Sequence, residues 1–283
     1  MIDYGVAGRV ALVTGANSPL GIGAAVARAL AAQGAVVALA ALPAHGTWPR
    51  PELAPGADLY AAAGAADPGY VRDEIVAAGG SGTVFEADLS DPGACVALLG
   101  AVEEALGPVE ILVNNAAYSV PDTFVPAGRD SFYRDSLPLT PDTLDAHYAV
   151  NTRAPALLMA ELHRRHLARG ADWGRVVNIS TDGATTFPTE VSYGATKYAL
   201  ESLSRSAAHE MAGAGITVNI VAPGPIQTGW ISADMLPGIE RDTPLGRVGT
   251  PQDVADVVTF LTSSQAHWLT GQLLFPGGGH RMI

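Results

Sequence analysis

Residues 10–23 read VALVTGANSPLGIG, and this stretch decides the fold of the chain. The apolar run at 10–13 predicts a buried strand, and the glycine-rich turn at 14–23 leads directly into the helical pattern AAVARALAAQG. Glycines in such a turn let backbone N–H groups approach a pyrophosphate, and the helix N-terminus adds a favourable dipole. Gly15, Gly21 and Gly23 are therefore expected to hold a dinucleotide. A tight turn without a ligand is the alternative.

Similar apolar runs recur along the chain and alternate with Ala- and Leu-rich helical patterns. The runs are apolar at nearly every position, which is typical of strands that helices cover on both faces. This alternation predicts an α/β fold with a mainly parallel sheet. The expected seven strands are at 10–13, 36–39, 83–85, 111–113, 176–179, 217–221 and 273–275. We expect one domain over residues 1–283.

Two stretches, 42–69 and 118–141, interrupt this rhythm and are richer in Pro and Gly than their surroundings. Long loops inside compact domains are uncommon and often functional. We therefore expect both inserted loops to contact a substrate or a partner, with a disordered insertion as the alternative.

The overall charge and the apolar pattern exclude two classes of partner. A net charge of -12 opposes binding to nucleic acid, because such binding needs clustered positive charge. The most apolar stretch, 24–42, contains Arg28 and Gln33 and is broken at Gly34, so it predicts a helix and a strand rather than a membrane span.

The N-terminus and the cysteine content indicate the compartment. A strand pattern begins within ten residues of the N-terminus, which leaves no room for a signal sequence, so a cytoplasmic protein is expected. Cys95 is the one cysteine and cannot form an internal disulfide. We interpret it as a small buried side chain, and no metal site is expected.

Tyr193 and Lys197 lie in the segment SYGATKYALE, which begins a long helical pattern. Their spacing places both side chains on one face of the helix. A tyrosine near pKa 10 transfers protons poorly at neutral pH, and an adjacent ammonium stabilises the phenolate. The sequence therefore predicts a catalytic pair in which Lys197 lowers the pKa of Tyr193.

Lys197 is also the one lysine among the 16 Lys and Arg side chains of the chain. A compact ammonium can fit between a tyrosine and ribose hydroxyls, whereas a planar guanidinium has a different reach and donor geometry. This pattern favours a chemical requirement for lysine at this position, with chance placement as the alternative. Upstream, Ser180 ends the strand at 176–179, where its hydroxyl could bond a developing alkoxide.

Together these features resemble the compact, single-domain branch of the short-chain dehydrogenase/reductase family, and the chain is similar to 3-oxoacyl-carrier-protein reductases. The likeness runs from about Arg9 to the C-terminus. It rests on TGANSPLGIG, the NNAA at 114–117, Asn151 in VNTRAP, Ser180, the YGATK at 193–197, the PGPIQT at 223–228 and the closing TGQLLFPGGG. The resemblance implies a Rossmann-type, doubly wound sheet with helices on both faces.

The resemblance also implies catalytic roles for four residues. Tyr193 would be the general acid/base, Lys197 would hold the nicotinamide ribose, Ser180 would orient the substrate oxygen, and Asn151 would position a proton-relay water. The implied cofactor-binding residues are Gly15, Asn17, Gly21, Ile22, Gly23, Asp88, Leu89, Asn114, Ala116, Tyr193, Lys197, Pro223, Gly224, Ile226 and Thr228. Two alternatives stay open: Asn114 could join neighbouring strands, and Asp88 could cap a turn.

The chain departs from the family pattern at the phosphate loop and at the catalytic hydroxyl. Five residues separate Gly15 from Gly21 where the family usually has three, and the extra pair lies close to Pro19 and Leu20. Counting back from Tyr193 selects Ser180, whereas counting forward from Asn178 in NIST selects Thr181. Neighbours on a strand face opposite sides, so only one of the two can face the substrate; we favour Ser180.

The end of the second strand bears on the choice between NAD and NADP. An acidic residue there would accept from a ribose 2′-hydroxyl, but this chain has Ala41 and Leu42. The absence of a carboxylate favours NADP(H) over NAD(H), and Arg50 or His45 would have to fold back to contact a 2′-phosphate.

The side chains of the second inserted loop indicate the class of substrate. It is longer than is typical for the family and is expected to lie at the mouth of the site. We expect Tyr118 and Trp230 to contact a bulky or cyclic ketone, with help from the other aromatic and basic side chains of the loop: Phe124, Arg129, Phe132, Tyr133 and Arg134.

The predicted function is hydride transfer between NAD(P)(H) and a small-molecule ketone or secondary alcohol, most simply by a ketoreductase. The alternative is a non-catalytic dinucleotide-binding regulatory or structural subunit, which would not need a proton relay. The family resemblance further suggests a homotetramer, or a homodimer, assembled partly through the helices around Asn151 and Tyr193.

Overall fold

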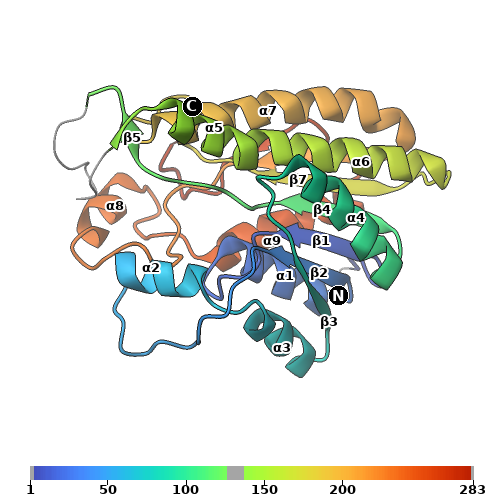
Figure 1. Cartoon of the computed structure of the whole chain (residues 1–283), viewed down its shortest axis with the longest axis horizontal. Helices are drawn as coiled ribbons and strands as arrows, with labels where there is room; N and C mark the ends of the chain where they lie inside the picture. Colours follow the sequence, from blue (N-terminus) through green and yellow to red (C-terminus); the bar gives the residue numbers. More distant parts are fainter. Residues whose placement is uncertain (1–2, 126–136, 282–283) are drawn as a thin grey trace.

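The computed structural model describes residues 3–125 and 137–281, and its centre is a parallel sheet of seven strands (Figure 1). Each strand contains or overlaps one of the predicted runs, which confirms the predicted fold class. Strand β9 ends one residue earlier than predicted, just ahead of Phe275 and Pro276. The order across the sheet is β3 (Ser81–Glu86), β2 (Val36–Ala41), β1 (Val10–Thr14), β4 (Val109–Asn114), β7 (Gly174–Ile179), β8 (Ile216–Val221) and β9 (Leu273–Leu274).

Helices cover both faces of the sheet, as a parallel sheet requires. One face packs against α1 (Ile22–Ala32), α3 (Gly69–Ala77) and α9 (Pro251–Thr262), and the other against α4 (Pro92–Leu106), α6 (Ala154–Ala168) and α7 (Val191–Met211). Helix α5 (Pro141–Tyr148) continues through the π-helical turn η1 (Ala149–Arg153) into α6. The 3-10 turns η2 (Ala212–Ala214) and η3 (Ser264–Ala266) follow α7 and α9.

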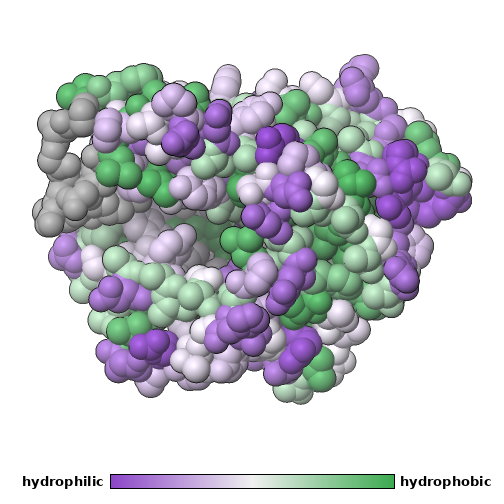
Figure 2. Space-filling model, viewed as in Figure 1, coloured by the Kyte–Doolittle hydropathy of each residue, from purple (hydrophilic) through white to green (hydrophobic). Residues whose placement is uncertain are grey.

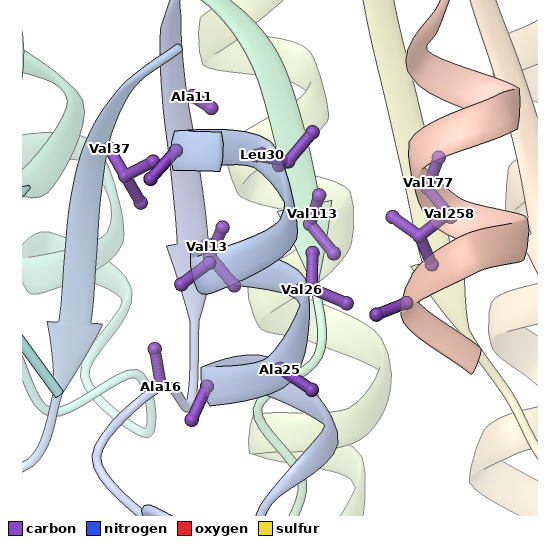
Figure 3. Close-up of a cluster of buried hydrophobic side chains, with 14 of the residues drawn as sticks. Ala11, Val13, Ala16, Ala25, Val26, Leu30, Val37, Val113, Val177 and Val258 are labelled. Atoms are coloured by element: carbon purple, nitrogen blue, oxygen red, sulfur yellow. The ribbon is translucent and has the colours of Figure 1, made fainter. Parts of the chain in front are cut away.

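The apolar core consists of two clusters, one on each face, because successive strand residues point to opposite sides. On β1, Ala11 and Val13 face α1 and α9, whereas Val10 and Leu12 face α4 and α6. Figure 3 shows the first cluster, in which Val26 and Leu30 of α1 lie close to the valines of the sheet. Burial of each such side chain stabilises the folded state by about 1.5–3 kcal/mol. The core therefore holds in place the edge of the sheet that carries the site.

The two inserted loops differ in what the structure shows. Residues 42–69 contain helix α2 (Ala57–Gly64), which excludes a disordered insertion there. The described part of 118–141 contains two short paired strands, β5 (Asp122–Thr123) and β6 (Leu137–Pro138). The predicted contact residues Arg129, Phe132, Tyr133 and Arg134 lie outside the described residues. Helix α8 (Leu236–Asp242) follows the PGPIQT segment.

Within the described residues, none of the helices combines the length and the apolar character needed to span a bilayer.

Candidate active site

The glycine loop between β1 and α1 has the geometry of a dinucleotide cradle. Gly15 has a positive φ of 66°, and a Cβ added there would lie 2.7 Å from the Ala116 Cα. A Cβ on Gly23 would lie 2.4 Å from the Gly15 carbonyl oxygen. Only glycine fits at these two positions. Gly21 is the N-cap of α1 and no side chain caps the helix there, so backbone N–H groups beginning with Ile22 are oriented to meet a phosphate.

Sequence reasoning missed the side chains that hold this loop in place. The Thr14 hydroxyl accepts from the backbone N–H groups of Asn115 and Ala116, both at 3.0 Å. The Asn115 amide donates to the carbonyl oxygens of Thr14 (2.9 Å) and Gly15 (3.0 Å). The second asparagine of NNAA therefore shapes the glycine loop, and the doubled asparagine was the signal that could have identified it.

Three predicted cofactor residues make contacts with protein groups. The Asn17 amide donates to the Gly64 carbonyl in α2 (2.5 Å). The buried Asn114 amide donates to Asn178 Oδ1 (2.7 Å), so it joins β4 to β7. Asp88 accepts from the Ser90 N–H (2.9 Å), so its carboxylate caps a turn. Asn114 thus joins neighbouring strands and Asp88 caps a turn, as the two alternatives predicted. The Asp88 side chain is exposed, so a ligand can still reach it.

The neighbouring residue Leu89 is 8% exposed and packs in the α4/α6 cluster, where its backbone carbonyl lies 3.5 Å from the Cys95 sulfur. Cys95 is buried and free, as expected. Leu89 can therefore offer a cofactor its backbone but not its side chain.

Helix α7 brings Tyr193 and Lys197 together at the carboxyl end of β7. The Lys197 Nζ lies 5.7 Å from the centre of the Tyr193 ring and donates to the Ile179 carbonyl oxygen (2.7 Å). Lys197 is 1% exposed, whereas Tyr193 keeps part of its surface open. The predicted pairing on one helix face is therefore present.

The electrostatics of this pair differ from the expectation. Burial raises the pKa of Tyr193, and the nearby Glu190, Tyr60 and Asp182 raise it further. Burial also lowers the pKa of Lys197 to about 8. The shift is therefore opposite in direction to the expected lowering of the Tyr193 pKa, and desolvation is its largest cause.

Ser180 does not present its hydroxyl to the open side of the site. It is 3% exposed and donates to Glu201 Oε1 of α7 (2.7 Å). Asn178 also faces α7, where its amide donates to the Ser204 hydroxyl (2.7 Å). Thr181, two residues after the end of β7, is half-buried. These surroundings favour Thr181 over the expected Ser180 as the candidate hydroxyl.

Asn151 lies in the π-helical turn η1 and is fully buried. Its Oδ1 accepts from the Tyr118 N–H (2.8 Å), and its amide donates to the Tyr118 carbonyl (2.9 Å) and the Thr196 hydroxyl (3.1 Å). Both amide N–H groups are thus engaged with protein. A relay water would have to bind the backbone, where a π turn loosens the regular carbonyl ladder.

The PGPIQT segment lies against the C-terminal segment. A Cβ on Gly224 would lie 2.9 Å from the Gly277 Cα, so these glycines allow two backbones to pack closely. Pro223 and Ile226 are buried, and Thr228 is half-buried with its N–H bonded to the Ile226 carbonyl (2.9 Å). The Trp230 indole also donates to the Ile226 carbonyl (3.0 Å), which folds the ring back over the segment.

Two further residues near Tyr193 were not predicted. Phe187 packs edge-on against the Tyr193 ring at 5.9 Å between centroids. Asp182, directly after Thr181, pairs with His280 of the C-terminal segment (2.7 Å). Burial raises the pKa of Asp182, and His280 opposes that shift. The Asp182–His280 pair joins segments almost 100 residues apart, so no local pattern could have indicated it.

Within residues 3–125 and 137–281, no group of three or more His, Cys, Asp or Glu side chains could hold a metal ion.

Comparisons with known proteins agree with this geometry. A family model described as enoyl-(acyl carrier protein) reductase matches residues 53–281. The oxidoreductase YjdA of Bacillus subtilis is 33% identical over 96% of this chain and 96% of its own. The 3-oxoacyl-[acyl-carrier-protein] reductase FabG of Escherichia coli is 32% identical over 98% of both chains.

A solved structure shows the same fold. A blue fluorescent protein from a metagenomic library, in complex with NADPH, is 28% identical and covers 98% of this chain and 99% of its own, with a TM-score of 0.76. YjdA and FabG both carry oxidoreductase names, which supports the enzymatic function over the non-catalytic alternative. The chain is therefore a member of the short-chain dehydrogenase/reductase family, an NAD(P)-dependent oxidoreductase that acts on CH–OH and C=O groups.

Proposed function

We propose that the protein reduces a bulky or cyclic ketone with NADPH and that Tyr193 donates the proton. The observation that carries this proposal is the placement of Tyr193 and Lys197 on one face of α7, at the carboxyl end of β7. Ligands of open α/β sheets bind at this edge. The glycine loop at the neighbouring strand β1 fits a pyrophosphate, so cofactor and proton donor would meet there.

The roles of the side chains follow from their surroundings. A bound nicotinamide would supply the hydride. The raised pKa of Tyr193 keeps its phenol protonated at neutral pH, so it can donate a proton to the substrate oxygen. Lys197 is anchored by the Ile179 carbonyl and keeps further N–H donors for a ribose hydroxyl. The Thr181 hydroxyl would donate to the same substrate oxygen and hold it in place.

The preference for NADPH rests on the end of β2. Ala41 is buried and Leu42 is exposed at this end of the strand. Neither side chain is a carboxylate, so neither would repel a 2′-phosphate. Arg50 is paired with Glu52 (2.5 Å), so it supplies no ready contact for that phosphate. The NADPH complex of the structural relative is consistent with this preference.

The substrate class follows from the aromatic side chains around Tyr193. Phe187 packs on the Tyr193 ring, and Asn151 fixes the backbone of Tyr118. Trp230 lies on the segment that follows the cofactor loop. With Tyr118 and Trp230 on the substrate side of the site, as we propose, these aromatic side chains suit a wide, apolar ketone better than a small polar one.

We also propose a cytoplasmic homotetramer, with a homodimer as the smaller assembly. Large apolar side chains are exposed on helices at both faces of the sheet, among them Leu167, Tyr198 and Leu203 on α6 and α7, and Phe260 and Trp268 on or near α9. Exposed apolar side chains on both faces would support two kinds of contact between copies. The single buried thiol suits a reducing compartment.

The test is oxidation of NADPH and NADH by the purified protein with β-ketoesters, cyclic ketones, quinones and a trans-2-enoyl thioester, beside Tyr193→Phe. We expect turnover of a ketone with NADPH and a loss of about a hundredfold or more in the variant, because a positioned acid contributes about 10²–10⁴-fold. Turnover of the enoyl thioester alone, or an active Tyr193→Phe, would contradict the proposal.

A further inference from the structure

Helix α2 is attached to the glycine loop. The ends of its segment meet where Gly46 pairs with Ala66, and the Gly46 N–H donates to the Ala65 carbonyl (2.8 Å). At its carboxyl end, α2 receives the hydrogen bond from Asn17 to the Gly64 carbonyl (2.5 Å). A side chain of the phosphate-binding turn is therefore used to hold α2.

Helix α2 is also attached to the segment that follows PGPIQT. At its amino end, the Gly56 N–H donates to the Gly229 carbonyl (2.8 Å). A Cβ built on Gly229 would lie 3.1 Å from Leu20 Cδ1 and 3.6 Å from Leu59 Cγ, so the two leucines flank this glycine. Leu59 is 9% exposed, which shows that its side chain is packed rather than free in solvent.

These contacts join the lengthened glycine loop to the first inserted loop. Leu20 belongs to the lengthened glycine loop, and Leu59 belongs to the first insertion. The glycine loop and residues 223–228 are two of the segments assigned to the cofactor, and α2 is bonded to Asn17 in the first and to Gly229 directly after the second. Figure 2 shows the surface hollowed above the position of α2, and Tyr60 of α2 acts electrostatically on Tyr193. The helix thus borders the cleft.

We propose that α2 is a clasp that retains the bound nicotinamide dinucleotide by tying the glycine loop to the segment after PGPIQT. The inference rests on the proposed function, because it concerns the same cofactor. With α2 in place, neither loop can open alone. The cofactor leaves only when the bonds at Gly64 and Gly229 and the packing of Leu59 are broken, so its dissociation is slow.

The test compares Leu59→Ala with Leu106→Ala, the same truncation at a half-buried leucine on α4 that packs against the α4/α6 cluster. Dissociation of NADPH, and separately of NADH, is followed by stopped-flow fluorescence after mixing with excess oxidised cofactor. We expect Leu59→Ala to raise the NADPH dissociation rate about tenfold, the equivalent of about 1.4 kcal/mol. Leu106→Ala should stay within about twofold.

The outcomes separate this inference from the proposed function. A wild type that binds neither cofactor refutes the proposed function. A wild type that binds and turns over, with an unchanged dissociation rate in folded Leu59→Ala, refutes the clasp alone. A raised KM for the ketone at an unchanged dissociation rate also refutes it, because α2 would then be a substrate wall.

If Leu59→Ala fails to fold, hydrogen exchange of the wild-type protein tests the clasp without a variant. The clasp requires residues 53–66 and 226–232 to gain protection together when NADPH is added, because Gly56 and Gly229 share a hydrogen bond. Protection confined to 226–232 would overturn it.

Discussion

Lys197 and Arg175 are two buried cations near opposite ends of strand β7, with 1% and 4% of their surface exposed. Burial lowers the pKa of both, to about 8 for Lys197 and to about 10 for Arg175, where the charge of Arg9 adds to the effect. The guanidinium therefore stays charged at neutral pH, whereas the ammonium is brought close to the working range. The same desolvation brings the pKa close to neutral pH only for the lysine.

The partners of the two cations differ as well. Arg175 lies 4.4 Å from the centre of the Trp173 ring, and Arg9 lies 3.6 Å from the same centre while pairing with Glu110. Lys197 instead contacts the Ile179 carbonyl and the face of a tyrosine that must move a proton. Ring stacking suits a planar cation, and a point charge suits a site that binds hydroxyls.

Exchange of the lysine for arginine tests the comparison most severely. Lys197→Arg should lower kcat/KM about a thousandfold, or about 4 kcal/mol, because a planar fork cannot replace the ammonium between Ile179 and Tyr193. Steady-state ketone reduction checks this result. An arginine variant that keeps a tenth of the activity would show that charge alone suffices.

Removal of the buried charge should raise stability while it abolishes catalysis. The shift from the ordinary value of 10.5 to about 8 corresponds to about 3 kcal/mol, so Lys197→Met should unfold with a free energy higher by about that amount at pH 7.

The sign of the pH dependence follows from the lowered pKa of Lys197. Between pH 8 and 10.5 the unfolded wild type binds the proton that the folded state has lost, so wild-type stability rises with pH there. Urea unfolding at pH 7 and near pH 10 should show the gap to Lys197→Met closing. A gap that stays constant would mean that desolvation is not its cause.

The two neighbouring hydroxyls at the carboxyl end of β7 should separate catalysis from packing. Thr181→Ala should lower kcat about a hundredfold, because one donor to a developing oxyanion contributes about 10²–10³. Ser180→Ala should leave kcat within a few-fold but reduce stability by about 1–3 kcal/mol, because Glu201 loses its donor. The reverse result would restore Ser180 as the catalytic hydroxyl.

The smallest effect is expected at the other end of the strand. Arg175→Lys should reduce the free energy of unfolding by about 1 kcal/mol through lost stacking on Trp173, with kcat within about twofold of wild type. Denaturant unfolding and steady-state kinetics measure the two quantities. A large drop in kcat would show that this end of the sheet is coupled to the chemistry.

Much of the fold could be predicted from sequence because local pattern and long-range packing agree. The central strands β1, β2 and β4 are largely apolar on both faces, so their runs are visible without neighbours, and the glycine positions are dictated by backbone contacts such as Gly15 against Ala116. The pairing of Tyr193 with Lys197 follows from helical spacing alone.

The remaining features depend on partners distant in the chain. The choice of Thr181 over Ser180 requires knowing that Glu201 faces β7. The pKa of Tyr193 depends on how deeply α7 packs, which no spacing reveals. Helix α2 is short and lies in a Pro- and Gly-rich stretch, and its attachment at Gly229 joins residues far apart in sequence.

The pairing at Gly46 has an evolutionary consequence. Because residues 46 and 66 lie side by side, the segment between them begins and ends at one place in the fold, so it can be gained, lost or exchanged in one genetic step without shifting β2 or α3. A Cβ on Gly46 would lie 2.4 Å from the Ala65 carbonyl oxygen, so this junction requires glycine at position 46. The segment can therefore be transferred as one unit, and grafting it onto a relative that lacks it is a practical route for enzyme engineering.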